Sequence, residues 1–140
     1  MTKDISIKEL EYVVFSLARD LMTYDEPIPD FVTRFSGVLE SCLAVPFQRF
    51  EKKSLYITID QKAAALFYLM IKNHPFQNGN KRIAMTTLLY FFFKNKKWLR
   101  IDEKKFYNFA VWIAESPAEL KKETLEAASR FIRTHTVVLE

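Results

Sequence analysis

The sequence predicts a single all-α domain of about six helices with a short β-like flap, covering residues 1–140. Apolar residues make up 49% of the 140 residues, which is enough to bury a core and excludes a disordered chain. Only two glycines are present, whereas a β sandwich or a glycine-rich nucleotide fold needs more positions with positive φ. Helical periodicity of apolar residues covers most of the chain, and only residues 54–59 have strand character.

The first helix is predicted from Ser6 to about Met22. Ser6 and Glu9 lie three residues apart and can form a capping box at its beginning. An apolar stripe at helical spacing follows: Leu10, Val13, Val14 and Leu17. Two prolines mark residues 24–30 as a loop.

The second helix is predicted from Asp30, as its cap, to about Ala44, because Pro46 then stops it. Residues 54–59, SLYITI, are strand-like but have no obvious partner strand. We therefore expect a flap or an extended loop there.

The third and fourth helices are predicted to form the centre of the domain. Asp60 can cap the third helix, which runs to about Asn73 and ends because of Pro75. The fourth is predicted for residues 80–94, and its apolar run at residues 83–93 indicates complete burial. Since both helices are apolar on most of their circumference, other helices should surround them.

Two more helices are predicted before the C-terminus. The fifth covers residues 102–114. The sixth begins at Ser116, with Pro117 at its first position and Glu119 closing a capping box. Residues 136–140 are expected to fray.

Composition excludes several classes of function. The net charge of +4 is too weak by itself to indicate nucleic-acid binding, and the lysines and arginines around Trp98 fit a helix C-terminus and a solvated face. One cysteine and two histidines make an internal disulfide or a structural zinc site implausible. No apolar run approaches the roughly 20 residues that cross a membrane, and the N-terminus lacks a signal-peptide pattern. We therefore expect a cytoplasmic protein without a membrane partner.

The polar segment at residues 74–82, HPFQNGNKR, lies between the two most buried predicted helices. Gly79 permits a backbone turn, and the helix that follows directs its unpaired N–H groups and positive dipole end at the segment. Lys81 and Arg82 add positive charge, and His74 can serve there as a general base. A phosphate-binding turn beside a histidine suggests phosphoryl or nucleotidyl transfer.

Simpler readings of this segment exist. A histidine before proline is commonly only a helix stop, and Gly-Asn before a helix is usually only a turn and cap. Lys-Arg at a helix start opposes the dipole, so it lowers stability unless an anion is bound. This last point favours a functional site.

The same segment resembles the motif of the Fic/Doc family, His-x-Phe-x-(Asp/Glu)-(Gly/Ala)-Asn-(Gly/Lys)-Arg. The matching residues are His74, Phe76, Gly79, Asn80, Lys81 and Arg82. Residues 39–46, LESCLAVP, are similar to the LESALA-x-P segment of Doc-like (death-on-curing) members. The resemblance covers residues 37–99 and implies the Fic fold.

The resemblance implies a role for each matching residue. His74 would deprotonate a hydroxyl on a target protein, and Phe76 would anchor the loop. The turn at Gly79 and Asn80, together with Lys81 and Arg82, would hold the phosphates of ATP. The flap segment (Leu55, Tyr56, Ile57, Thr58 and Ile59) would hold the target in extended form by strand pairing.

Two features favour the Doc-like toxin branch. AMP-transferring Fic enzymes usually have Gly where this chain has Lys81 and a second Arg where it has Met85. The best-known Doc-like member transfers the terminal phosphate of ATP to a threonine of elongation factor Tu. We therefore favour a protein kinase over an AMP transferase, with a similar target protein and a separate antitoxin as its partners.

One position departs from the family pattern. Asn78 stands where members have the acidic Mg²⁺ ligand. An amide oxygen can coordinate Mg²⁺ but lacks the charge that the ion prefers. The alternatives are therefore an active enzyme, or an impaired Fic-fold domain retained as a binding module.

Overall fold

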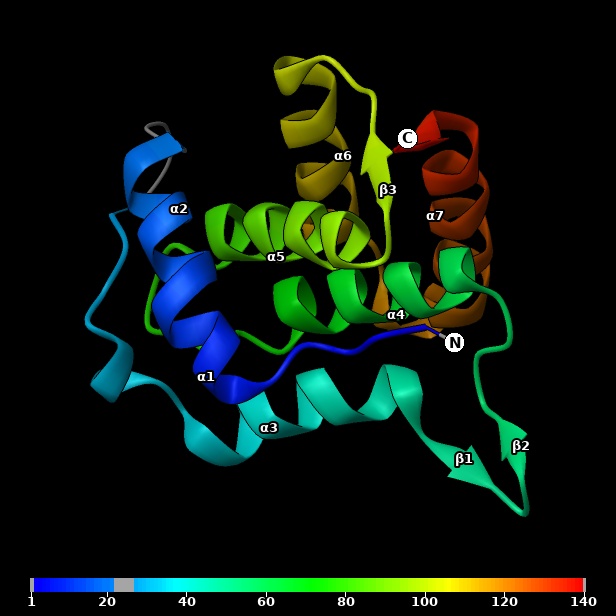
Figure 1. The fold of residues 1–140 in the computed structure, drawn as a ribbon, viewed down its shortest axis with the longest axis horizontal. Helices are drawn as coiled ribbons and strands as arrows, with labels where there is room; N and C mark the ends of the chain where they lie inside the picture. The colour runs from blue at the N-terminus through cyan, green and yellow to red at the C-terminus, as the bar shows by residue number, and fades with distance from the viewer. Residues whose placement is uncertain (1, 22–26, 140) are drawn as a thin grey trace.

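The computed structural model describes residues 2–21 and 27–139, and its helices surround a central helix, α4. The α-helices are α1 (Ile7–Glu9), α2 (Phe15–Leu21), α3 (Ser36–Ala44), α4 (Ile59–Lys72), α5 (Asn80–Lys94), α6 (Glu103–Glu115) and α7 (Lys121–His135). Helix α4 packs against α3, α5, α6 and α7 (Figure 1). The predicted all-α class is confirmed.

The first predicted helix is present as one continuous helical stretch. A π turn at Leu10–Val14 joins α1 to α2. The predicted capping box forms, since the Ser6 hydroxyl accepts from the Glu9 N–H at 3.1 Å and the Glu9 carboxylate accepts from the Ser6 N–H at 3.0 Å. Met22 and residues 24–26 of the predicted loop lie outside the described residues.

The second predicted helix begins later than expected. Asp30 precedes only a short 3-10 helix, Phe31–Thr33, and its side chain makes no cap hydrogen bond. The chain is extended at Arg34 and Phe35, where the Phe35 N–H donates to the Pro75 carbonyl at 2.9 Å. This bond to the 74–82 segment draws the backbone out of helical geometry, so α3 begins only at Ser36.

A small hairpin precedes α4. Strand β1 (Arg49–Phe50) pairs antiparallel with β2 (Lys53–Ser54), and residues 55–58 continue without regular structure. The cap of α4 is Thr58, not Asp60, because Thr58 and Gln61 form a reciprocal capping box. Ile59, predicted as part of the flap segment, is consequently the first residue of α4.

The core confirms the central position of α4. Every residue of α4 from Lys62 to Ile71 is buried, and Phe67 stacks on Phe109 of α6 at 5.3 Å between ring centroids. Helix α5 is buried at most positions but not completely, since Phe93 is 59% exposed. The prediction of complete burial was therefore wrong at the outer side of α5.

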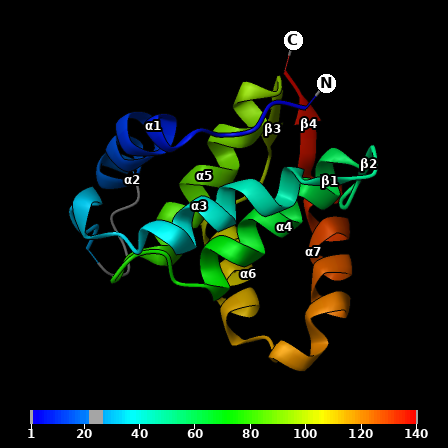
Figure 2. The same cartoon turned by 90° about the horizontal axis from the view of Figure 1, so that it is seen from below.

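The C-terminal part differs most from the prediction. Ser116 ends α6 by donating its hydroxyl to the Ile113 carbonyl, so it does not cap the next helix. A 3-10 turn, Ala118–Leu120, comes first. Residues 136–138 do not fray: strand β4 (Thr136–Val138) pairs antiparallel with β3 (Lys97–Leu99), as Figures 1 and 2 show, and Glu140 lies outside the described residues.

Within the described ranges, the helices are too short or too polar to cross a membrane. Cys42 lies buried in the core, and burial raises the pKa of its thiol to about 11.

Candidate functional site

The 74–82 segment connects the C-terminal end of α4 to the N-terminal end of α5 (Figure 1). Asn73 closes α4, and His74 follows in the left-handed region with φ 47°. Proline at the next position disfavours helical geometry at His74, which explains the helix end there. A non-glycine residue at positive φ is strained, and such strain is frequent at functional sites. The His74 side chain is exposed.

The Asn80 side chain stabilises the loop by hydrogen bonds to its backbone. Its Oδ1 accepts from the Phe76 N–H at 3.0 Å, and its Nδ2 donates to the Phe76 carbonyl at 3.0 Å. The same Nδ2 lies 3.5 Å from His74 Nδ1. Since Asn80 is only 8% exposed, its side chain shapes the loop, and an anion would meet its backbone rather than its amide.

Phe76 fixes the loop to the N-terminal helices. It is 1% exposed and lies 5.0 Å from the Phe15 ring and 6.4 Å from the Phe31 ring, measured between centroids. The three rings belong to the loop, to α2 and to the 3-10 helix. Their packing holds the segment in place relative to two other elements.

Gly79 is a position that requires glycine. Its φ is 71°, and it occupies the N-cap position of α5. A Cβ atom there would lie 2.9 Å from the Pro27 carbonyl oxygen and 3.2 Å from Ile28 Cδ1. Residues 27–28 therefore form a wall against the turn, and they leave no space for a side chain.

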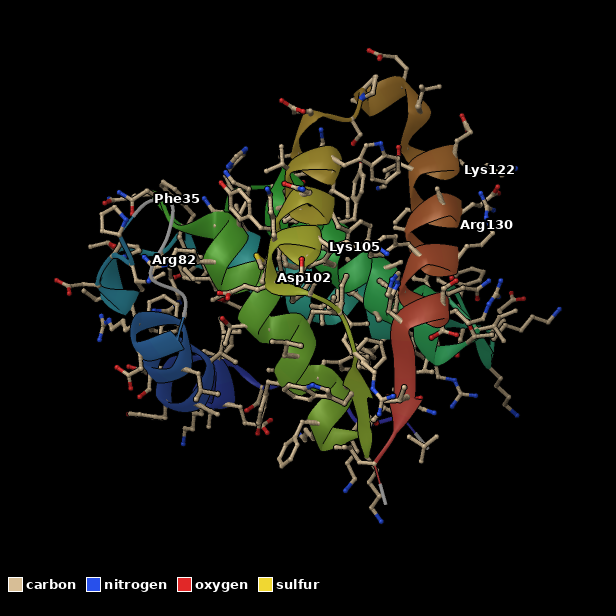
Figure 3. All side chains as sticks on the ribbon, turned by 90° about the horizontal axis from the view of Figure 1, so that it is seen from above. Phe35, Arg82, Asp102, Lys105, Lys122 and Arg130 are labelled. Carbon is tan, nitrogen blue, oxygen red and sulfur yellow. The ribbon has the colours of Figure 1, made fainter. Side chains whose placement is uncertain are left out.

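The two predicted phosphate-binding cations differ in their surroundings. Arg82 is 6% exposed, and its Nη2 donates to the Ala18 carbonyl of α2 at 3.0 Å; Figure 3 shows it reaching from α5 toward α2. Lys81 is half-buried on the first turn of α5. Arg82 thus joins two helices, while the N-terminal dipole of α5 adds positive potential beside it.

Asn78 carries an acceptor without a donor. Its Oδ1 is buried and accepts no hydrogen bond from any described residue. A buried carbonyl-type oxygen without a partner is destabilising, but it is suited to a hard cation such as Mg²⁺. The described residues contain no cluster of three or more His, Cys, Asp or Glu that could hold a metal. Asn78 fits Mg²⁺ as a single ligand, so phosphate oxygens would have to complete the shell.

The structure does not bring the flap segment to His74. The two lie at opposite ends of α4 (Figures 1 and 2), whose 14 residues span about 21 Å. Several main-chain groups of the segment are already bonded: Leu55 N to Gln48 O, Ile57 N and Thr58 N to Gln61 Oε1, and Tyr56 O and Ile57 O to Lys62 Nζ. A target strand pairing here would have to displace some of these bonds.

Lys62 is a residue that sequence reasoning missed. It stands directly before the apolar run of residues 63–71 and is 9% exposed, with its ammonium bonded to the flap carbonyls. Burial, followed by repulsion from Arg49, lowers its pKa. Its position one residue before the apolar run, on a helix predicted to be central, was the signal that could have identified it.

The other end of α5 carries a second polar cluster. The Glu9 carboxylate accepts from Lys94 Nζ at 2.7 Å and from the Tyr90 hydroxyl at 2.7 Å. Burial raises the pKa of Glu9, but these bonds and the one from the Ser6 N–H outweigh it and hold the pKa at about 2. The Asn95 side chain bonds the N–H and carbonyl of Lys3.

Comparison with known proteins agrees with this geometry. A family model described as Fic/DOC family matches residues 7–92, which is more than half of the chain and includes the whole 74–82 segment. The match is to the family as a whole and does not separate its branches. Neither the curated proteins nor the solved structures gave a match.

Proposed function

Because the chain belongs to the Fic/DOC family, whose members are typically ATP-using transferases, we propose that it transfers the terminal phosphate of ATP to a hydroxyl of another protein. The observation behind this proposal is the 74–82 loop. There the left-handed turn at Gly79 opens the N-terminus of α5 within the same short loop as His74. Helix N-termini bind phosphates through their backbone N–H groups and dipole.

His74 is the proposed general base. It takes the proton from the target hydroxyl while the hydroxyl oxygen attacks the γ-phosphorus; the bond from that phosphorus to the bridging oxygen breaks, and ADP leaves. Asn80 positions the imidazole through the 3.5 Å contact between its Nδ2 and His74 Nδ1. The bonds from Asn80 to the Phe76 backbone fix the Asn80 side chain relative to the turn.

The cations stabilise the phosphates of ATP. Lys81 contributes its ammonium from the first turn of α5, and Arg82 contributes from its buried position beside α2. Lys81 and Met85, at positions where AMP transferases usually have Gly and Arg, support transfer of phosphate over transfer of AMP. An antitoxin and a target such as elongation factor Tu are the partners that this proposal implies.

Mg²⁺ is part of the proposal. When bound, it would neutralise charge on the phosphates, and Asn78 Oδ1 would be the protein ligand that holds it. Since Asn78 brings no charge, the affinity for Mg²⁺ should be lower than in a member with an acidic residue there.

Paired labelling tests the proposal. Purified protein, Mg²⁺ and elongation factor Tu, or a bacterial extract, are incubated with ATP labelled at the γ or the α phosphate. We expect label from γ only, reduced at least about 100-fold by His74→Ala. The matched control is His135→Ala, which alters the other histidine, at the end of α7, and should leave transfer unchanged. Label from α would establish AMP transfer instead.

The missing acidic charge at position 78 favours one second candidate, a Fic-fold binding module with little catalysis. In that case neither label is transferred by the wild type, and Asn78→Asp gains transfer. A wild type that turns over ATP as fast as Asn78→Asp excludes this candidate.

A further inference from the structure

A groove of about 710 Å³ lies between the flap segment and α7, at the end of α4 remote from His74. One of its walls comes from residues 55–57 and Gln61, and the other comes from α7. Six residues of α7 line it: Lys122, Leu125, Glu126, Ser129, Arg130 and Arg133. Their spacing of three and four places them on one face of the helix.

On this face of α7, Leu125 is the apolar residue that lines the groove, and basic residues lie on both sides of it. Leu125 and Ser129 are half-buried, while Lys122, Arg130 and Arg133 are exposed. Figure 3 shows Lys122 and Arg130 on the same side of α7. Opposite them, Leu55 and Ile57 of the flap segment are 62% and 78% exposed. The groove therefore presents apolar side chains between two walls, with cations along one of them.

The charges of the groove are not balanced internally. Three cations line it against one carboxylate, Glu126. Within the described residues, Lys122, Arg130 and Arg133 take part in no ion pair. Burial raises the pKa of Asp60, and the positive charges of Arg133 and Lys97 oppose that rise without cancelling it. The unpaired excess is thus positive and runs along α7 from Lys122 to Arg133.

We propose that this groove binds an acidic, leucine-rich segment of a partner protein. The apolar side chains of such a segment would pack between Leu125 and the exposed Leu55 and Ile57, and its carboxylates would face Lys122, Arg130 and Arg133. The exposed apolar surface of the flap segment, which would otherwise face water, then becomes part of an interface. The groove lies about one length of α4 from His74, so the bound segment is distinct from any hydroxyl that reacts there.

Fluorescence anisotropy tests this binding without ATP, and its outcome is separate from that of the transfer assay. The probe is a labelled peptide of about 12 residues that combines glutamate with leucine at helical spacing. Its counterpart has lysine in place of every glutamate. We expect the acidic peptide to bind, more weakly as salt rises, and the basic peptide not to bind.

Two triple variants locate the binding. Lys122→Glu, Arg130→Glu and Arg133→Glu together should weaken binding at least about tenfold. The matched control, Lys8→Glu, Arg100→Glu and Lys104→Glu, changes the net charge equally at exposed positions outside the groove and should bind as the wild type does. Leu125→Ala tests the apolar part and should weaken binding severalfold.

Three results overturn the proposal. The first is equal binding of the acidic and basic peptides. The second is an equal loss of binding in the two triple variants. The third is a labelled single-stranded oligonucleotide that binds more tightly than the acidic peptide and competes with it, because the groove would then bind nucleic acid. Circular dichroism of each variant verifies that α7 remains folded.

Discussion

The two ends of α5 differ in whether their polar groups have hydrogen-bond partners within the chain. At the C-terminal end, Lys94 is paired with Glu9, and Asn95 bonds both backbone groups of Lys3. At the N-terminal end, Asn78 Oδ1 is buried without a donor, and His74 is exposed and strained. At the C-terminal end, the polar groups bond to other residues of the chain. At the N-terminal end, a hydrogen-bond acceptor and an imidazole are left to interact with a ligand.

This difference teaches how to separate a structural cluster from a functional one in the same helix. Both ends contain charged residues, and both contain a non-glycine residue with positive φ, His74 at one and Lys96 at the other. Charge and strain therefore do not discriminate between them. The unsatisfied oxygen does, because a buried polar atom without a partner lowers stability unless a ligand meets it.

The largest effect is expected at the N-terminal end. Gly79→Ala should lower the free energy of unfolding by about 3 kcal/mol, because a Cβ would meet the Pro27 carbonyl at 2.9 Å and the left-handed backbone disfavours alanine. The matched control is Gly37→Ala, in α3, where a Cβ meets no atom within 4 Å and stability should not fall. Urea unfolding of both variants measures the difference. Equal free energies of unfolding for the two variants would show that residues 27–28 do not restrict the space beside Gly79.

The second effect is pH-dependent and belongs to the C-terminal end. The pKa of Glu9 is lowered from 4.5 to about 2, so the stabilisation from its bonds is complete above pH 4.5 and is lost as pH falls toward 2. The loss should be roughly 2 kcal/mol, allowing for partial exposure of the carboxylate. Thermal melts between pH 7 and pH 2 measure it. In Glu9→Gln the loss of stability between pH 7 and pH 2 should be smaller. An unchanged dependence of stability on pH would show that Glu9 is not its source.

Third in size is the loss of the Asn95 bonds. Asn95→Ala removes the side chain that accepts from the Lys3 N–H and donates to the Lys3 and Phe91 carbonyls. We expect a loss of about 1.5 kcal/mol without any change in transfer activity. Denaturant unfolding and the labelling assay, performed on the same preparation, check both parts. A loss of activity at unchanged stability would mean that this end of the helix also serves the reaction.

The smallest effect comes from glycine at the two strained positions. Lys96→Gly and His74→Gly each relieve a positive φ and should raise stability by about 0.5 kcal/mol, since the gain is partly offset by the entropy of glycine in the unfolded chain. Only His74→Gly should abolish transfer. If His74→Gly keeps full activity, His74 is not the general base.

Local signals predicted the fold well, and long-range contacts account for what they missed. The Ser6–Glu9 capping box and the helix end at His74 depend on neighbours in the sequence, so both could be predicted. The late start of α3 depends on the Phe35–Pro75 bond, and no local pattern reveals it. The pairing of β3 with β4 escaped prediction for the same reason, because each strand is only three residues long.

The candidate site was predictable in composition but not in geometry. The HPFQNGNKR segment identified the family, and the roles given to its residues stay predictions. That Arg82 reaches Ala18, and that Asn80 bonds Phe76, depends on which way each side chain turns within the folded domain. The flap segment precedes α4 and His74 follows it, so their separation by the length of that helix follows from the order of the chain. The β1–β2 hairpin before the flap segment was not predicted.

The hydrogen bonds around the turn that follows α5 also determine whether the order of the helices along the chain can be changed. The Lys3 N–H bonds Asn95, and the Leu139 N–H bonds the carbonyl of Lys96, so the two terminal segments are held at adjacent residues. A short linker between them would close the chain into a ring. Opening that ring between α6 and α7, where residues 117–120 are exposed, gives a circular permutant in which the 74–82 loop is untouched.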